Sequence, residues 1–216
     1  MGELEQRLYT LCFNDNPPEF IESLFDPNVS FYCIDKLEEI QEILNKTVNV
    51  NWCNVNGWTP LIAACMKGDI EIVKLLLKDQ RLNVNFVSGT RASPLYIACE
   101  QGQIEIVKLL LNDNRVDINK GRNTGTTPFF IACRKGHIEI VKLLLNDQRV
   151  DINKSNNDIQ TPFFIACQKG RIEIVKLLFH DQRVDVKKVD KFGQTPFYIA
   201  CYWRRIEVVE LLLNDN

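Results

Sequence analysis

A ten-residue segment at residues 136–145, Gly-His-Ile-Glu-Ile-Val-Lys-Leu-Leu-Leu, recurs with few changes along this chain. Its other copies begin at Gly68, Gly102, Gly170 and Arg204, so each copy starts 34 residues after the previous one. Five prolines keep the same spacing: Pro60, Pro94, Pro128, Pro162 and Pro196. A constant period of this length indicates a chain built from structural repeats.

Within one copy, Glu139, Lys142 and Asn146 fall at i, i+3 and i+7, which places them on one narrow stripe of a helix. Apolar residues occupy the rest of that helix, so it has to be covered on several sides. A single unit of this size cannot cover it, whereas similar units stacked side by side cover one another. The sequence therefore predicts an all-α, elongated solenoid instead of two globular domains.

Each repeat carries the signals of two helices. Thr or Ser followed by Pro, as in Thr127-Pro128, is a hydroxyl N-cap with proline at the first helical position. The first helix contains an Ala-Cys pair and ends at a glycine such as Gly136. Because the second helix holds the bulky residues, we expect the stack to curve, with a concave face on the small-residue side. Residues 146–153 and their equivalents are expected to be extended chain leading to a turn.

Charge and hydropathy exclude several classes of protein. The net charge of −2 and the pI near 5.8 lack the basic excess that a phosphate backbone attracts, so no nucleic-acid partner is expected. Lys and Glu interrupt every apolar run, and the acidic N-terminus lacks a secretory signal. A membrane association is therefore not expected.

The chain has eight cysteines, five of which occupy one position of successive repeats: Cys65, Cys99, Cys133, Cys167 and Cys201. Equivalent positions of stacked helices lie about 8–10 Å apart, beyond the Cα separation of about 7 Å that a disulfide bridges. The chain has no Cys-x-x-Cys and no histidine placed to complete a zinc site. We expect small buried side chains, no metal or other cofactor, and reduced thiols in a cytoplasmic or nuclear protein.

The motifs Gly-x-Thr-Pro, Ala-Cys-x-x-Gly-His-Ile-Glu-Ile-Val-Lys-Leu-Leu-Leu and Val-Asp-Ile-Asn resemble the ankyrin repeat. The resemblance implies stacked helix-turn-helix units with β-hairpin-like finger loops. It covers five repeats of 34 residues, at about 50–83, 84–117, 118–151, 152–185 and 186–216. The family's usual period is about 33 residues. Its usual His after Thr-Pro-Leu is replaced here by residues that must pack instead: Ile62, Tyr96, Phe130, Phe164 and Tyr198.

Two fingers lack the turn glycine that the others carry as Gly57, Gly125 and Gly193. They have Arg91 and Ile159 instead, and a β-branched residue resists a left-handed turn. We expect these two fingers to differ in shape from the rest.

Residues 1–49 are predicted to form a degenerate N-terminal capping region. It would consist of a helix pair at 4–13 and 18–25, followed by a decayed repeat at 26–49. At the other end, the last apolar run lacks the continuation that follows the earlier copies. We expect either further chain there or an apolar edge that associates with something.

No catalytic site is predicted, because His137 and His180 are the only histidines and nearly all carboxylates recur at solvent-facing positions. Positions that differ between repeats are more informative. In ankyrin-like proteins such positions line the finger tips and the concave face. The candidate partner-binding residues are Trp58, Met66, Lys67, Glu100, Gln101, Arg122, Arg134, Lys135, Gln168, Lys169, Arg171, Lys191, Phe192, Tyr202 and Trp203.

Two aromatic groups within this set are candidate hot spots: Trp58 with Met66, and Phe192 with Tyr202 and Trp203. The basic residues between them favour a partner with an acidic segment. The alternative for the basic residues is a solvated surface without a partner. The alternative for the aromatic groups is packing at the end of the stack. Asparagine recurs at the finger base, as Asn51, Asn85, Asn119 and Asn153. In ankyrin repeats asparaginyl hydroxylases can modify this position, so these four residues are candidate hydroxylation sites. The alternative is a purely structural role in hydrogen bonding.

The sequence thus favours a non-catalytic scaffold that binds another protein through its fingers and concave helix face. Two alternatives stay open. The repeats are the targeting or substrate-recruitment module of a longer multidomain protein or enzyme, or they form a structural spacer that associates with itself through its C-terminal edge.

Overall fold

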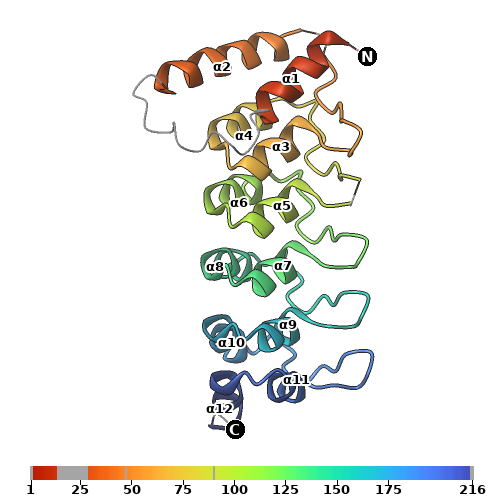
Figure 1. Ribbon diagram of the computed structural model, residues 1–216, viewed down its shortest axis with the longest axis vertical. Coiled ribbons are helices and arrows are strands. Elements are labelled where there is room, and N and C mark those ends of the chain that lie inside the picture. The colour runs from red at the N-terminus through yellow and green to blue at the C-terminus, as the bar shows by residue number, and fades with distance from the viewer. Residues whose placement is uncertain (1, 14–28, 47, 90, 215–216) are drawn as a thin grey trace.

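The computed structural model describes residues 2–13, 29–46, 48–89 and 91–214. Within these ranges the chain forms two rows of α-helices, stacked into an elongated body with loops along one side (Figure 1). The row next to the loops, called the inner helices, comprises α1 (Glu3–Phe13), α3 (Pro60–Lys67), α5 (Pro94–Gln101), α7 (Pro128–Lys135), α9 (Pro162–Lys169) and α11 (Pro196–Tyr202). The other row, called the outer helices, comprises α2 (Val29–Leu44), α4 (Ile70–Leu77), α6 (Ile104–Leu111), α8 (Ile138–Asn146), α10 (Ile172–Phe179) and α12 (Ile206–Asn214).

The inner helices of the first four repeats begin and end as their sequence predicts. In α7, Thr127 is the N-cap and its hydroxyl oxygen accepts a hydrogen bond from the Phe130 N–H at 3.1 Å. Pro128 is the first helical residue, and Gly136 ends the helix with a φ of 91°. The same Thr or Ser cap, proline and left-handed glycine occur in α3, α5 and α9.

The core lies between the two rows and continues from repeat to repeat. The residues that replace the family's usual histidine pack in it as expected, because Ile62, Tyr96, Phe130 and Phe164 are at most 1% exposed. Cys65, Cys99, Cys133 and Cys167 are buried free thiols, and their burial raises the pKa of each. The prediction was wrong for Cys201, which is exposed because no further inner helix stacks on α11 among the described residues.

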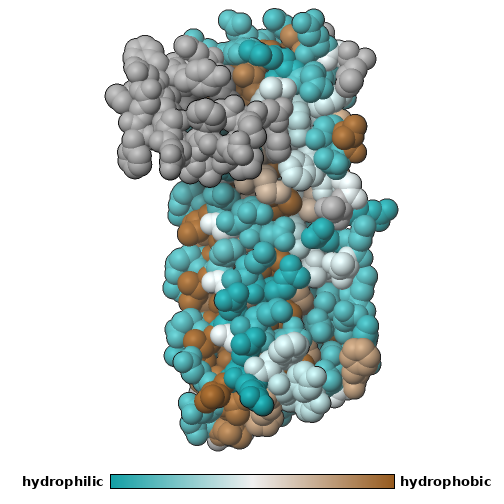
Figure 2. Space-filling model, in the orientation of Figure 1, coloured by the Kyte–Doolittle hydropathy of each residue, from teal (hydrophilic) through white to brown (hydrophobic). Residues whose placement is uncertain are grey.

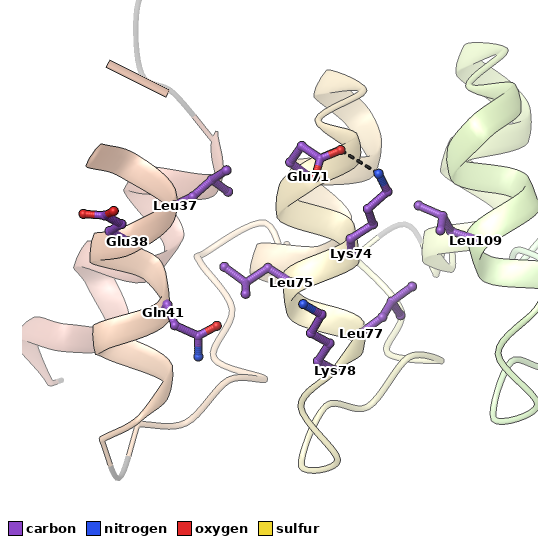
Figure 3. A pocket seen from close by; sticks show the side chains of 9 residues that line it. All are labelled: Leu37, Glu38, Gln41, Glu71, Lys74, Leu75, Leu77, Lys78 and Leu109. Atoms are coloured by element: carbon purple, nitrogen blue, oxygen red, sulfur yellow. Dashed lines mark hydrogen bonds and ion pairs between the residues drawn. The ribbon is translucent and has the colours of Figure 1, made fainter. Parts of the chain in front are cut away.

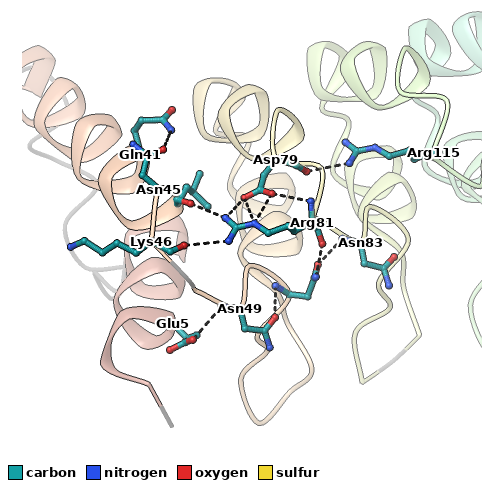
Figure 4. Close-up of polar contacts among 11 residues, drawn as sticks. Glu5, Gln41, Asn45, Lys46, Asn49, Asp79, Arg81, Asn83 and Arg115 are labelled. Carbon is teal, nitrogen blue, oxygen red and sulfur yellow. Dashed lines mark hydrogen bonds and ion pairs between the residues drawn. The ribbon is translucent and has the colours of Figure 1, made fainter.

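The loops after α4, α6, α8 and α10 each hold an Asp–Arg pair that reaches the preceding outer helix. In the second repeat, Arg115 Nη2 contacts Asp113 Oδ2 at 2.6 Å and also donates a hydrogen bond to the Leu77 carbonyl at 2.8 Å. The same pair is formed by Asp79 and Arg81, whose contacts Figure 4 shows. We call these pairs the Asp–Arg clamps; the others are Asp147–Arg149 and Asp181–Arg183. Each clamp supplies a cation and a donor to the C-terminal carbonyls of a neighbouring outer helix.

The four finger-base asparagines also join consecutive repeats. The Asn119 side chain donates to the Arg149 carbonyl at 2.7 Å, and its amide oxygen accepts from the Asp151 N–H at 2.8 Å. Asn51, Asn85 and Asn153 make the equivalent two bonds. The segments that hold them are turns, not the extended chain expected from alternating Val and Ile.

The prediction that two fingers differ in shape was wrong. Arg91 and Ile159 adopt φ values of 57° and 61°, close to the 70–76° of the glycines at the same position. Their N–H groups close the same turn, with Arg91 N bonded to the Ser88 carbonyl and Ile159 N to the Asn156 carbonyl. These fingers therefore reach the common shape at the cost of local backbone strain.

The N-terminal region differs from the predicted arrangement. α1 packs against α3, and α2 packs against both α1 and α4, so these two helices occupy the positions of one repeat's helix pair. α2 begins at Val29 and is continuous to Leu44, within the segment 26–49 where a decayed repeat was expected. Its buried residues Ile40 and Ile43 lie 33 positions before Val73 and Leu76, which are buried in the outer helix α4. The helix predicted at 18–25 lies outside the described residues.

Candidate functional site

The candidate residues on the inner helices lie in one row down the stack. Lys67, Gln101, Lys135 and Lys169 are the last residues of α3, α5, α7 and α9, and all are exposed. The preceding residue of each helix, namely Met66, Glu100, Arg134 or Gln168, is half-buried. The inner helices stack directly on one another beside the finger loops (Figure 1). The residue pairs at their C-terminal ends therefore form a continuous strip. We call this strip the inner-helix strip.

Side chains from the start of each outer helix connect the strip across repeats. Arg171 Nε donates to the Arg134 carbonyl at 3.2 Å, and Arg205 Nε donates to the Gln168 carbonyl at 2.9 Å. His137 Nε2 lies 3.2 Å from the Glu100 carbonyl oxygen. The sequence predicted that Arg171 belongs to the partner-binding surface. It did not predict that Arg171 also links two repeats. The signal was present in the sequence, because these residues all follow the helix-ending position at the repeat period.

This link explains why α3, α5, α7 and α9 each end at a glycine. A Cβ on Gly102 would lie 2.9 Å from His137 Cε1, and one on Gly136 would lie 3.0 Å from Arg171 Cδ. Gly68 and Gly170 meet Gln103 and Arg205 in the same way. Positive φ and close approach therefore both require glycine here.

The middle of the strip is basic. Lys135, Lys169 and Arg171 are exposed, and Arg134 lies 3.9 Å from Glu100, the one acidic candidate of the strip. At this distance the ion pair leaves the guanidinium donors available for stronger hydrogen bonds. The strip therefore presents more positive than negative side chains to a partner.

The fingers form a hydrogen-bonded row beside the strip. Asn157 N donates to the Thr124 carbonyl at 2.9 Å, and Lys191 N donates to the Asp158 carbonyl at 3.0 Å. Lys191 Nζ also contacts Asp158 Oδ1 at 2.6 Å. The exposed tips are thus held relative to one another through the backbone, which limits the entropy lost when they bind.

The two predicted aromatic groups are only partly assembled. Trp58 and Met66 are half-buried and pack against the core, so their side chains also stabilise the first repeat. Tyr202 and Trp203 are in contact, with ring centroids 5.7 Å apart. Phe192 is 73% exposed and its ring lies under Lys191 Nζ at 4.9 Å, with no ring contact to Tyr202 or Trp203 in the described structure.

Tyr198 belongs to the C-terminal aromatic group, although the sequence reasoning placed it in the core. Its ring stacks on Tyr202 with centroids 6.2 Å apart, and it is 48% exposed. Arg122 lies away from the strip, at a finger base, with its guanidinium 5.4 Å from the centre of the buried Tyr96 ring. It is therefore partly a packing residue.

A groove of about 580 Å³ lies on the other side of the molecule, among the outer helices α2, α4 and α6 (Figure 3). Leucines of these helices line it, and the Glu71–Lys74 ion pair lies at its edge with 2.6 Å between Nζ and Oε1. None of the candidate residues lies there. Residues 2–13, 29–46, 48–89 and 91–214 contain no cluster of His, Cys, Asp and Glu that could hold a metal ion, and no helix in them could span a bilayer.

Paired helices stacked at a fixed period, with a hydrogen-bonded row of fingers, define a helical repeat protein. The family model for ankyrin repeats matches residues 12–122, 81–156, 114–190 and 148–216. The chain therefore belongs to the ankyrin repeat family, whose members are usually non-catalytic and typically act as protein–protein interaction modules. No curated protein matches the chain.

Proposed function

We propose that this protein is a scaffold that binds another protein across the inner-helix strip and the finger tips. The main support for the proposal is that the inner-helix strip and the finger tips form one continuous surface. Residues that differ between repeats are adjacent in space, as in the Glu100–Arg134 and Asp158–Lys191 pairs. Residues that set the stacking are nearly the same in every repeat and are buried wherever another repeat follows.

The charge of the strip favours a partner segment with acidic side chains. Lys135, Lys169, Arg134 and Arg171 come from two neighbouring repeats and from both rows of helices. An acidic segment that crosses these repeats meets several cations at once, which raises the association rate and fixes its register. Tyr202 and Trp203 provide an aromatic anchor at one end of the strip.

The test is capture of partners by the immobilised chain, followed by direct binding of the purified captured protein. Lys135→Glu with Lys169→Glu should weaken binding at least about tenfold, because two attractions become repulsions. The matched control is Lys142→Glu with Lys176→Glu, which makes the same charge change on outer helices. Equal loss in both double variants, or no loss in either, contradicts the proposed surface.

A further inference from the structure

The C-terminal end of the stack differs from the interfaces between its repeats. Phe197 and Tyr198 are 40% and 48% exposed, whereas the equivalent Phe163 and Phe164 are at most 1% exposed. Ile206 is 68% exposed and Leu213 is 56% exposed. Figure 2 shows hydrophobic residues gathered at this end of the molecule. We call this surface, formed by α11 and α12, the C-terminal face.

Two substitutions within the repeat motif lie on this face. Arg204 takes the place of the helix-ending glycine, and Glu210 takes the place of the lysine found as Lys74, Lys108, Lys142 and Lys176. Both residues line one pocket of about 320 Å³, together with Cys201, Ile206 and Val209. The pocket thus combines an arginine and a glutamate around an apolar centre.

Arg204 makes the face unsuitable for another repeat stacked like the earlier ones. At the equivalent glycines, a Cβ would meet the linking side chain of the following repeat at 2.6–3.0 Å. Arg204 has a Cβ and a long side chain at the same left-handed conformation, with a φ of 54°. A repeat in the usual position would need its linking side chain to move aside.

Glu210 places a negative charge where the earlier repeats have a positive one. In the earlier repeats the lysine at this position pairs with the glutamate three residues before it, as in Lys176–Glu173 at 2.9 Å. The last repeat has Glu207 and Glu210 instead, and neither forms an ion pair within the described part of the chain. The carboxylate of Glu210 therefore lacks the ion pair that this position forms in the earlier repeats. It lines the same pocket as the Arg204 cation.

We propose that the C-terminal face binds the same face of a second copy of this chain, forming a twofold dimer. A twofold axis brings each patch against itself, so Arg204 of each copy meets Glu210 of the other while the apolar centres are buried together. The opposite end does not fit this face, because it is covered by α1 and α2. In α1, Glu3, Gln6 and Arg7 are exposed, and Leu4 is the only large hydrophobic exposed among the described side chains of these two helices. The proposal does not depend on the inner-helix strip.

The test is sedimentation velocity of the full chain over a range of protein concentrations. We expect a monomer–dimer equilibrium, with a dissociation constant at least about tenfold higher for Glu210→Arg or Arg204→Glu alone. A mixture of these two single variants should recover the dimer, because each Glu of one variant then faces an Arg of the other. Lys176→Glu, at the equivalent position of α10, should leave the dissociation constant unchanged.

Cysteine alkylation gives a second readout. Cys201 is exposed in the single chain, and Cys65, Cys99, Cys133 and Cys167 are buried, so the first reacts with an alkylating reagent and the others are internal controls for unfolding. Dimer formation should slow the reaction of Cys201 alone. A monomer at every concentration, assembly beyond dimers, or a dimer that both single variants leave unchanged overturns the proposal.

Discussion

Arg115 Nη2 donates a hydrogen bond to the Leu77 carbonyl at 2.8 Å, although the two residues belong to different repeats and are 38 positions apart. Asp113 holds the guanidinium in place through Nε and Nη2. The contact gives the last turn of α4 a partner that its own helix cannot supply. The outer helices are therefore coupled by polar contacts as well as by their apolar faces.

Replacing Arg115 should destabilise the stack. Arg115→Ala removes the side-chain donor of the Leu77 carbonyl and leaves the Asp113 carboxylate only the backbone N–H of residue 115, so we expect a loss of about 1–2 kcal/mol in the free energy of unfolding. Urea unfolding followed by circular dichroism measures it. The control is Lys108→Ala, which removes an exposed ion pair with Glu105 and should cost less than about 0.5 kcal/mol. Equal losses would show that the clamp adds nothing beyond a surface ion pair.

The clamps should also make stability depend on pH in the acid range. The Arg115 guanidinium lowers the pKa of Asp113 below its usual 3.8, mainly through a side-chain hydrogen bond, and the same holds for Asp79, Asp147 and Asp181. A carboxylate whose pKa is lower in the folded chain stabilises it above the unfolded pKa, and this stabilisation is lost as the pH falls through the folded pKa. Stability should therefore fall as the pH decreases below about 4.

Asp113→Asn isolates one clamp in that experiment. We expect the variant to be less stable than the parent chain at neutral pH, with a difference that shrinks as the parent carboxylate is protonated. Urea unfolding at a series of pH values gives the two curves. A difference that stays constant down to low pH would mean that the Asp113 charge is not what stabilises the loop.

The left-handed Ile159 should be a site where stability can be gained. Ile159→Gly removes the strain of a β-branched residue at a φ of 61° and gives up little burial, since Ile159 is 46% exposed. We expect a net gain of about 1 kcal/mol, allowing for the greater entropy of glycine in the unfolded chain. Thermal unfolding would show it as a higher midpoint.

The converse change tests the same argument at Gly125. A Cβ there would lie 2.6 Å from Asn157 Oδ1 and 3.0 Å from Asn157 N, at a φ of 75°. Gly125→Ala should therefore lower the midpoint of thermal unfolding. If Ile159→Gly lowers stability and Gly125→Ala does not, the turn conformation assigned to the fingers is wrong.

The finger-base asparagines should contribute to stability through both ends of their amides. Asn119→Ala removes one donor and one acceptor across a repeat boundary and should cost about 1–3 kcal/mol. Asn119→Asp should cost more at neutral pH, because it places a carboxylate against the Arg149 carbonyl. Urea unfolding compares the two variants, and an aspartate variant as stable as the parent would contradict this geometry. Hydroxylation of these asparagines stays a separate prediction, which mass spectrometry of the natively expressed protein tests.

The helix pairs and their caps could be predicted from the sequence because the signals are local and repeat in register. Thr127, Pro128 and Gly136 specify the ends of α7 without reference to any other repeat. The clamp of Asp113 and Arg115 could not be predicted, because its acceptor is a backbone carbonyl from the preceding repeat and has no signature in sequence. The continuous helix α2 was not predicted for a related reason, since its position is set by packing on α1 and α4.

The exposure of the candidate residues could be predicted from the sequence only in part. Repeat variability identified Lys135 and Lys169, which are exposed in one row. It did not distinguish Trp58, which is half-buried against the core, from Trp203, which is 50% exposed. It also missed Tyr198, because the same position is buried wherever another repeat follows. Exposure of a repeated position depends on its neighbour in the stack, which the local sequence does not contain.

Amide hydrogen exchange of the full chain, with and without its purified captured partner, locates the surface that the partner covers. We expect slower exchange at the C-terminal ends of α3, α5, α7 and α9 and in the finger loops, with little change in α4, α6, α8 and α10. Protection of the outer helices, with the inner-helix strip and fingers unchanged, would rule out the proposed binding surface.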